Sequence, residues 1–154
     1  MKNFSLAFFF ILSLGARASD FLEGSATFRP QQGLTATVSV NRTGIEYTLK
    51  SAVKSRRFFI PLDIEGRPHL DVDDFDFDGR KDFSVWYLDE GMGNYTIHRV
   101  FVYRSRLGAF EEVLPRCSED FLNLKINHAK QTLTSTYFSK NKPKICVTRL
   151  KRAH

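Results

Sequence analysis

Four aspartates between residues 74 and 82 have the spacing of a loop that binds a hard cation. Positions 1, 3, 5 and 9 of this segment carry Asp74, Asp76, Asp78 and Asp82. Gly79 occupies position 6, where the backbone of such loops turns sharply, and oxygen ligands in this pattern favour Ca²⁺. We therefore expect the four aspartates to bind Ca²⁺, with Arg80 contributing its carbonyl oxygen. An acidic surface turn without metal is the alternative.

The loop differs from an EF-hand because position 12, where that motif needs a glutamate, is Val85. Val85 lies in residues 83–88, which read as a strand, and no helical periodicity flanks the loop. The segment instead resembles the calcium hairpins of FG-GAP and integrin-type β-propeller repeats, in which the metal ties two strands together. We expect a structural ion, and we expect Phe75, Phe77 and Phe83 to pack in the core.

The elements that position this loop are predicted to be short strands. Residues 34–40 and 45–49 alternate apolar and polar side chains around a turn at 41–44 and predict a hairpin. Residues 57–62 contain Pro61 and predict an edge strand or a strand end. The other predicted strands are 70–72, 83–88, 96–104, 109–114, 122–126, 133–137 and 145–147, and residues 118–124 hold the signals of a short helix.

The nine or ten predicted strands indicate an all-β fold. We expect a small propeller-like or sandwich-like antiparallel sheet array with a calcium hairpin. The chain of 154 residues leaves 136 after an expected export signal at residues 1–18, and residues 19–154 suit one domain. A leader retained in the membrane is the alternative to cleavage, and no cysteine near residue 18 encodes a lipid anchor.

The net charge and the cysteine content limit the classes of binding partner and the cellular compartment that we expect for this protein. Loss of Lys2 and Arg17 with the signal lowers the basic count from 23 to 21 against 17 acidic residues, a net charge of +4. An exported basic protein meets wall polymer, anionic lipid or acidic proteins before nucleic acid. Cys117 and Cys146 predict one disulfide, with two free thiols or half of a metal site as alternatives.

A second motif follows the acidic loop at residues 89–95, where two glycines precede a tyrosine. The matching positions across residues 70–113 are Asp74, Asp76, Phe77, Asp78, Gly79, Asp82, Phe83, Gly91, Gly93, Asn94, Tyr95, Tyr103, Gly108 and Phe110. Together they resemble the periplasmic calcium-binding immunity proteins that protect bacteria against lysozyme-like effectors of Xanthomonas-type type IV secretion systems. Members of that family are longer and contain two such halves, whereas this chain has room for one.

The resemblance implies a periplasmic inhibitor without enzymatic activity, whose protein partner is a peptidoglycan-degrading effector enzyme. It implies that Gly91, Gly93 and Asn94 let a loop enter the active-site cleft of that enzyme and that Tyr95 is the inserted side chain. The residue types agree, because glycines suit a narrow groove and a tyrosine hydroxyl can meet a catalytic carboxylic acid. An ordinary hairpin loop with Tyr95 packed on a strand is the alternative.

Two other functions fit the sequence. A calcium-stabilised surface or periplasmic β-module for adhesion or cell-wall binding would use the same calcium hairpin. A calcium-dependent hydrolase would need a nucleophile and base in a recognisable frame, and the sequence shows none. The basic C-terminal stretch from Lys140 to Arg152 is a solvated face in the simplest interpretation and a docking surface for an acidic partner or an anionic wall polymer in the other.

Overall fold

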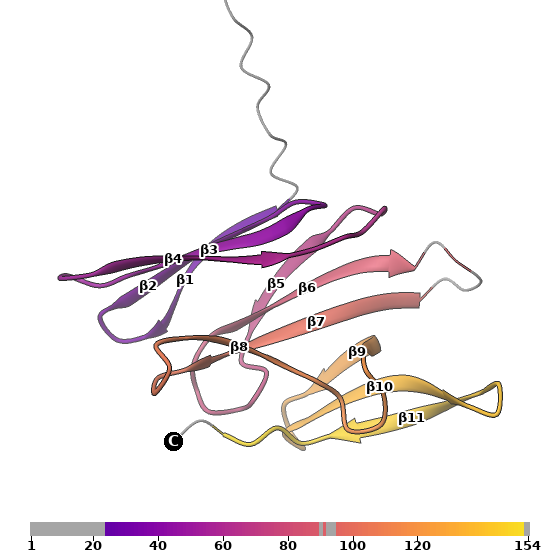
Figure 1. The fold of residues 1–154 in the computed structure, drawn as a ribbon. Helices are drawn as coiled ribbons and strands as arrows, with labels where there is room; N and C mark the ends of the chain where they lie inside the picture. Colours follow the sequence, from indigo (N-terminus) through magenta and orange to yellow (C-terminus); the bar gives the residue numbers. More distant parts are fainter. Residues whose placement is uncertain (1–23, 90, 92–94, 153–154) are drawn as a thin grey trace, which may run out of the picture.

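The computed structural model describes residues 24–89, 91 and 95–152, and every regular element in this part of the chain is a β-strand. Eleven strands form two antiparallel sheets (Figure 1). The predicted all-β, sandwich-like or propeller-like antiparallel array is therefore confirmed. The expected export signal at residues 1–18 lies outside the described residues. No helix in the described ranges is long and apolar enough to cross a membrane.

The first sheet, sheet A, is a meander of consecutive strands. Its order is β1 (Gly24–Gln31), β2 (Leu34–Val40), β3 (Gly44–Lys50) and β4 (Ser55–Pro61). The predicted hairpin at 34–49 is confirmed, with Val40 opposite Ile45. Its turn is closed by the Asn41 side-chain oxygen, which accepts the backbone N–H of Thr43 and of Gly44, each at 2.9 Å. β4 lies at the sheet edge and ends at Pro61, as the missing N–H of proline predicts.

The second sheet, sheet B, is organised around its longest strand, β7. The strands of sheet B are β5 (His69–Asp73), β6 (Asp82–Asp89), β7 (Tyr95–Arg104), β8 (Ala109–Val113), β9 (Phe121–Asn127), β10 (Thr132–Ser139) and β11 (Lys142–Thr148). One edge of β7 pairs with β6, and the other is shared: residues 100–104 pair with β8 and residues 97–98 with β9. Sheet B therefore divides at β7, and β9, β10 and β11 form a separate layer below it (Figure 1).

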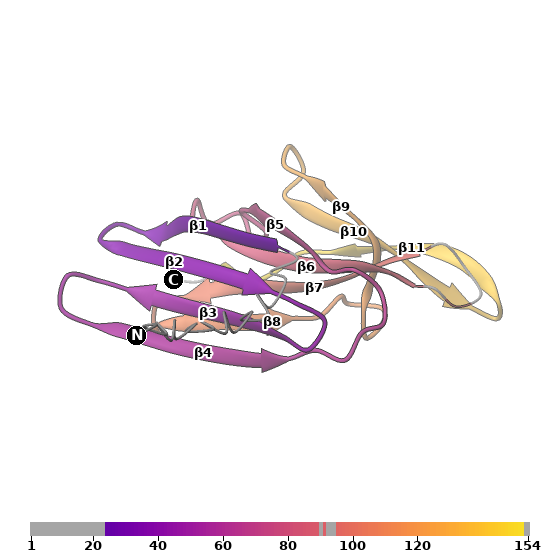
Figure 2. The same ribbon diagram turned by 90° about the horizontal axis from the view of Figure 1, so that it is seen from above.

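Two hydrophobic cores lie on opposite faces of β7. Successive side chains of a strand point to opposite faces, so Phe101 and Tyr103 join the core under sheet A. Val100 and Val102 join a second core with Phe121 of β9 and with residues of β10 and the acidic loop. Viewed from above, β1 to β4 cover β6, β7 and β8 (Figure 2). β7 is thus held from both sides.

The predicted helix at residues 118–124 is wrong, because β9 begins at Phe121 and residues 118–120 form a bend. Phe121 is only 1% exposed and is a member of the second core. Its burial, together with pairing to β10, outweighs the helix-start signals of Ser118, Glu119 and Asp120. Strand β1 was not predicted from the sequence.

Candidate metal centre and the hairpin it anchors

The acidic loop connects β5 to β6, as the sequence predicts. These strands pair from His69 opposite Trp86 to Asp73 opposite Asp82, so residues 74–81 close a hairpin. Asp74 shapes the loop: Oδ1 accepts the N–H of Asp78 at 3.1 Å, and Oδ2 accepts the N–H of Gly79 at 2.8 Å. Gly79 has φ +86°, a conformation that residues with a Cβ rarely adopt.

Three of the predicted ligands converge inside this loop. Carboxylate oxygens of Asp74, Asp76 and Asp78, one from each residue, all lie within 4.8 Å of one another. Asp76 is 1% exposed, and its Oδ2 lies 3.0 Å from Nη1 of Arg104. The group could hold a metal ion, since carboxylates gathered at this distance are the ligand set of a hard cation.

Asp78 shows that the site fits a cation. Its side chain is 5% exposed, and Oδ1 accepts the N–H of Arg80 at 2.8 Å. Oδ2 is buried and accepts no hydrogen bond from any described residue; the Nε of Arg80 lies 3.8 Å away. A buried carboxylate oxygen without a donor is costly, and a bound cation would compensate it. The carbonyl of Arg80 as a further ligand stays a prediction.

Asp82 lies beside this group but is committed to backbone amides. Oδ2 accepts the N–H of Phe75 at 3.0 Å, and Oδ1 accepts the N–H of Tyr103 at 2.8 Å, so the side chain joins the loop to β7. Burial raises the pKa of Asp82 to about 8, the two amides oppose the rise, and the charges of Asp76 and Asp78 add to it. A divalent cation would relieve this repulsion. Asp82 as a direct ligand stays a prediction.

Packing holds the loop in a strained shape. Phe77, between two of the converging aspartates, has φ 60°, which costs a bulky residue on the order of 1–3 kcal/mol. Its ring packs on the second core and edge-on against His128 at 5.9 Å between centroids, as the core prediction for Phe75, Phe77 and Phe83 anticipates. These contacts keep the neighbouring carboxylates in place.

The sequence did not indicate two neighbours of the loop. Arg104, at the end of β7, contacts Asp76, and His128, between β9 and β10, has Nε2 3.2 Å from Oδ2 of Asp73. Both lie far from the loop in sequence, and only the pairing of β7 and the layer formed by β9 and β10 bring them there. No local pattern of residue types could have identified them.

The predicted target-binding residues fall between β6 and β7, at the opposite end of β6 from the acidic loop. Gly93 and Asn94 lie outside the described residues, whereas Gly91 is exposed and its N–H donates to Asp89 Oδ1 at 3.0 Å. The ring of Tyr95 is half-buried and packs edge-on against Phe138 of β10, with 5.4 Å between centroids.

A hollow of about 320 Å³ lies beside this end of β6. Its lining includes the carboxylates Asp63, Glu65 and Asp89 together with Gly91 and Leu88. Leu88 is 52% exposed. The end of the hairpin therefore combines acidic side chains, an exposed apolar side chain and a tyrosine.

Across β5, β6 and β7 runs a row of three rings on the face opposite sheet A. Trp86 stacks on His69 with 4.0 Å between centroids and on His98 with 5.8 Å. The Nε2 of His98 lies 3.0 Å from Oγ1 of Thr96. Burial lowers the pKa of His98 to about 4, which the charge of Asp71 only partly opposes. The imidazole of His98 is therefore neutral at pH 7.

Cys117 and Cys146 form the predicted disulfide, which ties the connection between β8 and β9 to β11. A disulfide is typical of exported proteins. The chain matches no protein-family model, no curated protein and no solved structure in the three comparisons made.

Proposed function

We propose that this protein is an exported, calcium-stabilised inhibitor that binds a peptidoglycan hydrolase through the end of its β6–β7 hairpin. The observation that supports it most is the layout of that hairpin. The acidic loop and Asp82 fix its root against β5 and β7, and Tyr95 and the acidic hollow lie at the opposite end. The seven register pairs from Phe83–Phe101 to Asp89–Tyr95 separate root and end by roughly 20 Å.

Calcium is the proposed ion because the donor set consists of carboxylates. Three aspartate oxygens converge, and the Arg80 carbonyl and Asp82 are the further predicted ligands; a set of oxygens alone suits a cation that accepts six to eight oxygens in flexible geometry. No sulfur or imidazole atom belongs to the converging group, so a thiolate-binding metal is disfavoured. The ion acts as a staple between strands in this proposal, and the protein has no catalytic role.

The chemistry at the hairpin end suits an enzyme that degrades an anionic wall. Such an enzyme benefits from positive charge around its cleft, and Asp63, Glu65 and Asp89 offer complementary negative charge. Tyr95 supplies an apolar ring and a hydroxyl, the kind of anchor that dominates protein interfaces. Periplasmic location is part of the proposal, supported by the disulfide and by the resemblance of residues 70–113.

The proposal is tested with purified protein added to lysozyme-type glycan hydrolases turning over a cell-wall suspension. Inhibition is expected to be complete at one inhibitor molecule per enzyme molecule. Tyr95→Ala is expected to weaken the affinity for the enzyme on the order of a hundredfold. Tyr95→Phe separates the ring from the hydroxyl, because it removes only the group proposed to meet the catalytic acid.

Phe138→Ala is the matched control, since it removes the ring on which Tyr95 packs and leaves Tyr95 in place. If Tyr95 acts only by packing, the two alanine variants will lose inhibition equally, and the proposed contact with the enzyme is wrong. If the protein inhibits none of the hydrolases tested, the proposed function is wrong.

A further inference from the structure

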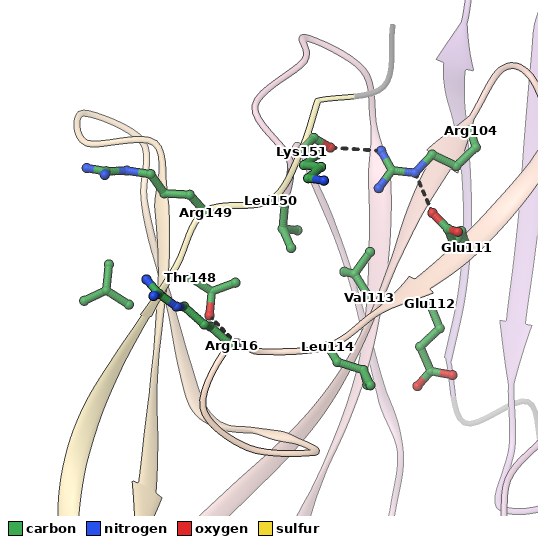
Figure 3. A pocket seen from close by; sticks show the side chains of 11 residues that line it. Arg104, Glu111, Glu112, Val113, Leu114, Arg116, Thr148, Arg149, Leu150 and Lys151 are labelled. Carbon is green, nitrogen blue, oxygen red and sulfur yellow. Dashed lines mark hydrogen bonds and ion pairs between the residues drawn. The ribbon is translucent and has the colours of Figure 1, made fainter.

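A groove of about 720 Å³ lies between the end of β8 and the chain that follows β11. Figure 3 shows its two walls, residues 111–116 on one side and residues 147–151 on the other. Val113 and Leu150 face each other across it and rest on the second core (Figure 3). Leu114 is 60% exposed and Val147 is 50% exposed, so apolar surface continues from the floor onto the walls.

Both ends of the groove are tied. At one end the Cys117–Cys146 disulfide joins the walls, and the N–H of Arg116 donates to Oγ1 of Thr148 at 3.0 Å. At the other end Nη1 of Arg104 donates to the carbonyl oxygen of Lys151 at 3.2 Å. Between these ties no backbone hydrogen bond joins the two walls in the described residues. The groove is therefore held open and has backbone groups available.

The charges along the groove are uneven. Glu111 accepts a hydrogen bond from Arg104 at 2.7 Å, and Glu112 accepts two from Arg99 at 2.6 Å. Arg116 at one end and Lys151 at the other have no carboxylate partner among the described residues. Three residues of extended chain separate Thr148, beside Arg116, from Lys151, which is roughly 10 Å. These two cations thus flank an apolar floor, and Arg149, which also lines the groove, adds a third positive side chain.

We propose that this groove binds an extended, acidic segment of a partner protein, with carboxylates at its two ends and apolar side chains between them. The carboxylates pair with Arg116 and Lys151, the apolar side chains cover Leu114 and Val147, and the segment's backbone bonds to the free edges of the walls. Because the groove is already held open, its walls lose little conformational entropy when the segment binds.

Other occupants match the groove less well. A second copy of this chain would bring the same cations to the surface and be repelled. A phosphate-rich wall polymer would pair with the cations but would leave the apolar floor and the backbone groups without partners. Arg104 at the end of β7 lines the groove, whereas Tyr95 begins the same strand, nine residues away. This inference is therefore independent of the hydrolase proposal.

Fluorescence anisotropy of a labelled peptide tests the inference. The probe is a fluorescein-labelled peptide with the central sequence Glu-Val-Leu-Glu, and the control peptide carries lysine at both glutamate positions. The full-length protein is expected to bind the acidic peptide and not the lysine peptide. Arg116→Gln combined with Lys151→Gln is expected to weaken binding on the order of tenfold or more, because two charge-assisted contacts are lost.

The matched control is Lys54→Gln combined with Arg57→Gln, which removes the same charge from the exposed surface of sheet A and its neighbouring turn. Equal loss in both double variants would show general electrostatic attraction and overturn the proposal. Leu114→Ser removes an exposed apolar side chain without opening the core. It is expected to weaken binding of the acidic peptide and to leave binding of polyphosphate unchanged. The proposal would also be overturned if polyphosphate bound as tightly as the peptide and Leu114→Ser changed the affinity for neither ligand.

Discussion

At the scale of single residues, the acidic loop gathers buried carboxylates whose charges repel one another. Asp78 has a buried oxygen without a donor, and Asp76 and Asp82 lie beside it at 1% exposure each. The loop keeps this arrangement although Phe77 is strained. Strain and uncompensated charge at one place are typical of a site that gains a ligand.

Asp78→Asn is expected to remove the response to calcium without harming the apoprotein. Calcium at a hundred times its dissociation constant stabilises a protein by about 2.7 kcal/mol, which raises the melting temperature by several degrees. The asparagine oxygen can still accept the N–H of Arg80, and the lost charge lowers the repulsion in the loop.

Thermal melts in calcium and in EDTA measure this effect. Asp71→Asn, an exposed residue outside the converging group, is the control and should keep the full shift. A calcium shift of unchanged size in Asp78→Asn would show that the ion binds elsewhere.

His98 predicts how stability depends on pH. Its pKa is lowered from 6.5 to about 4, so between these values the unfolded chain binds a proton that the folded protein does not. The contribution of His98 to the free energy of unfolding therefore stays constant above the unfolded pKa and decreases as pH falls from about 6.5 towards 4, whereas Asp82, whose pKa is raised to about 8, contributes in the opposite direction. Urea unfolding followed by Trp86 fluorescence at several pH values measures the slope.

His98→Gln should remove the His98 contribution, so the difference in the free energy of unfolding between the unaltered protein and the variant should change as pH falls from about 6.5 to 5, while the contribution of Asp82 is common to both. An unchanged slope in the variant would assign the pH dependence to other groups.

At the scale of elements, the alternation of apolar and polar side chains predicted most strands, and the spacing of the aspartates predicted the acidic loop. The strands from residue 34 to residue 147 were predictable because each carries either local side-chain alternation or a short apolar run between turn residues. β1 was not, since Arg29 and Pro30 interrupt its short apolar pattern. The helix at 118–124 was wrong because its signals are local, whereas the burial of Phe121 comes from distant residues.

The sequence could not predict which side chains other strands bring to the loop. Asp74, Asp76 and Asp78 converge as expected because their spacing belongs to one loop. Arg104 and His128 arrive from β7 and from the turn after β9, through the division of sheet B. Strand pairing between residues that are far apart in the sequence produces no local pattern of residue types.

The disulfide is expected to stabilise the layer formed by β9, β10 and β11. Cys117→Ser combined with Cys146→Ser should lower the free energy of unfolding by about 2–4 kcal/mol, because a loop of 29 residues is no longer closed in the unfolded chain. The urea midpoint measures the loss, and addition of reductant to the unaltered protein is the control. A midpoint that neither change moves would contradict a stabilising role.

At the scale of the whole molecule, β7 belongs to both cores and links them into one unit. Phe101 and Tyr103 contribute to one core and Val100 and Val102 to the other, so β7 contributes buried side chains to both. The acidic loop, the end of the β6–β7 hairpin and the groove beside β8 are all attached to this strand or to its partners. The two cores therefore share one strand that connects three separate surfaces.

Unfolding is accordingly expected to occur in a single transition. Trp86 fluorescence reports on β6, and far-ultraviolet circular dichroism reports on both sheets, and the two should give the same urea midpoint. Phe83→Ala in the first core and Phe121→Ala in the second should each shift both signals together. Two separate midpoints would mean that sheet A and sheet B unfold as independent units.

The meander of sheet A has a consequence for how the chain acquires its structure. Its four strands follow one another within residues 24–61, so every pairing in that sheet is between neighbours in sequence, and such short-range contacts form rapidly. Sheet B needs partners that are distant in the chain and a covalent crosslink that is made slowly. As the chain folds, residues 24–61 can therefore form sheet A first, and the remaining strands can then assemble on it.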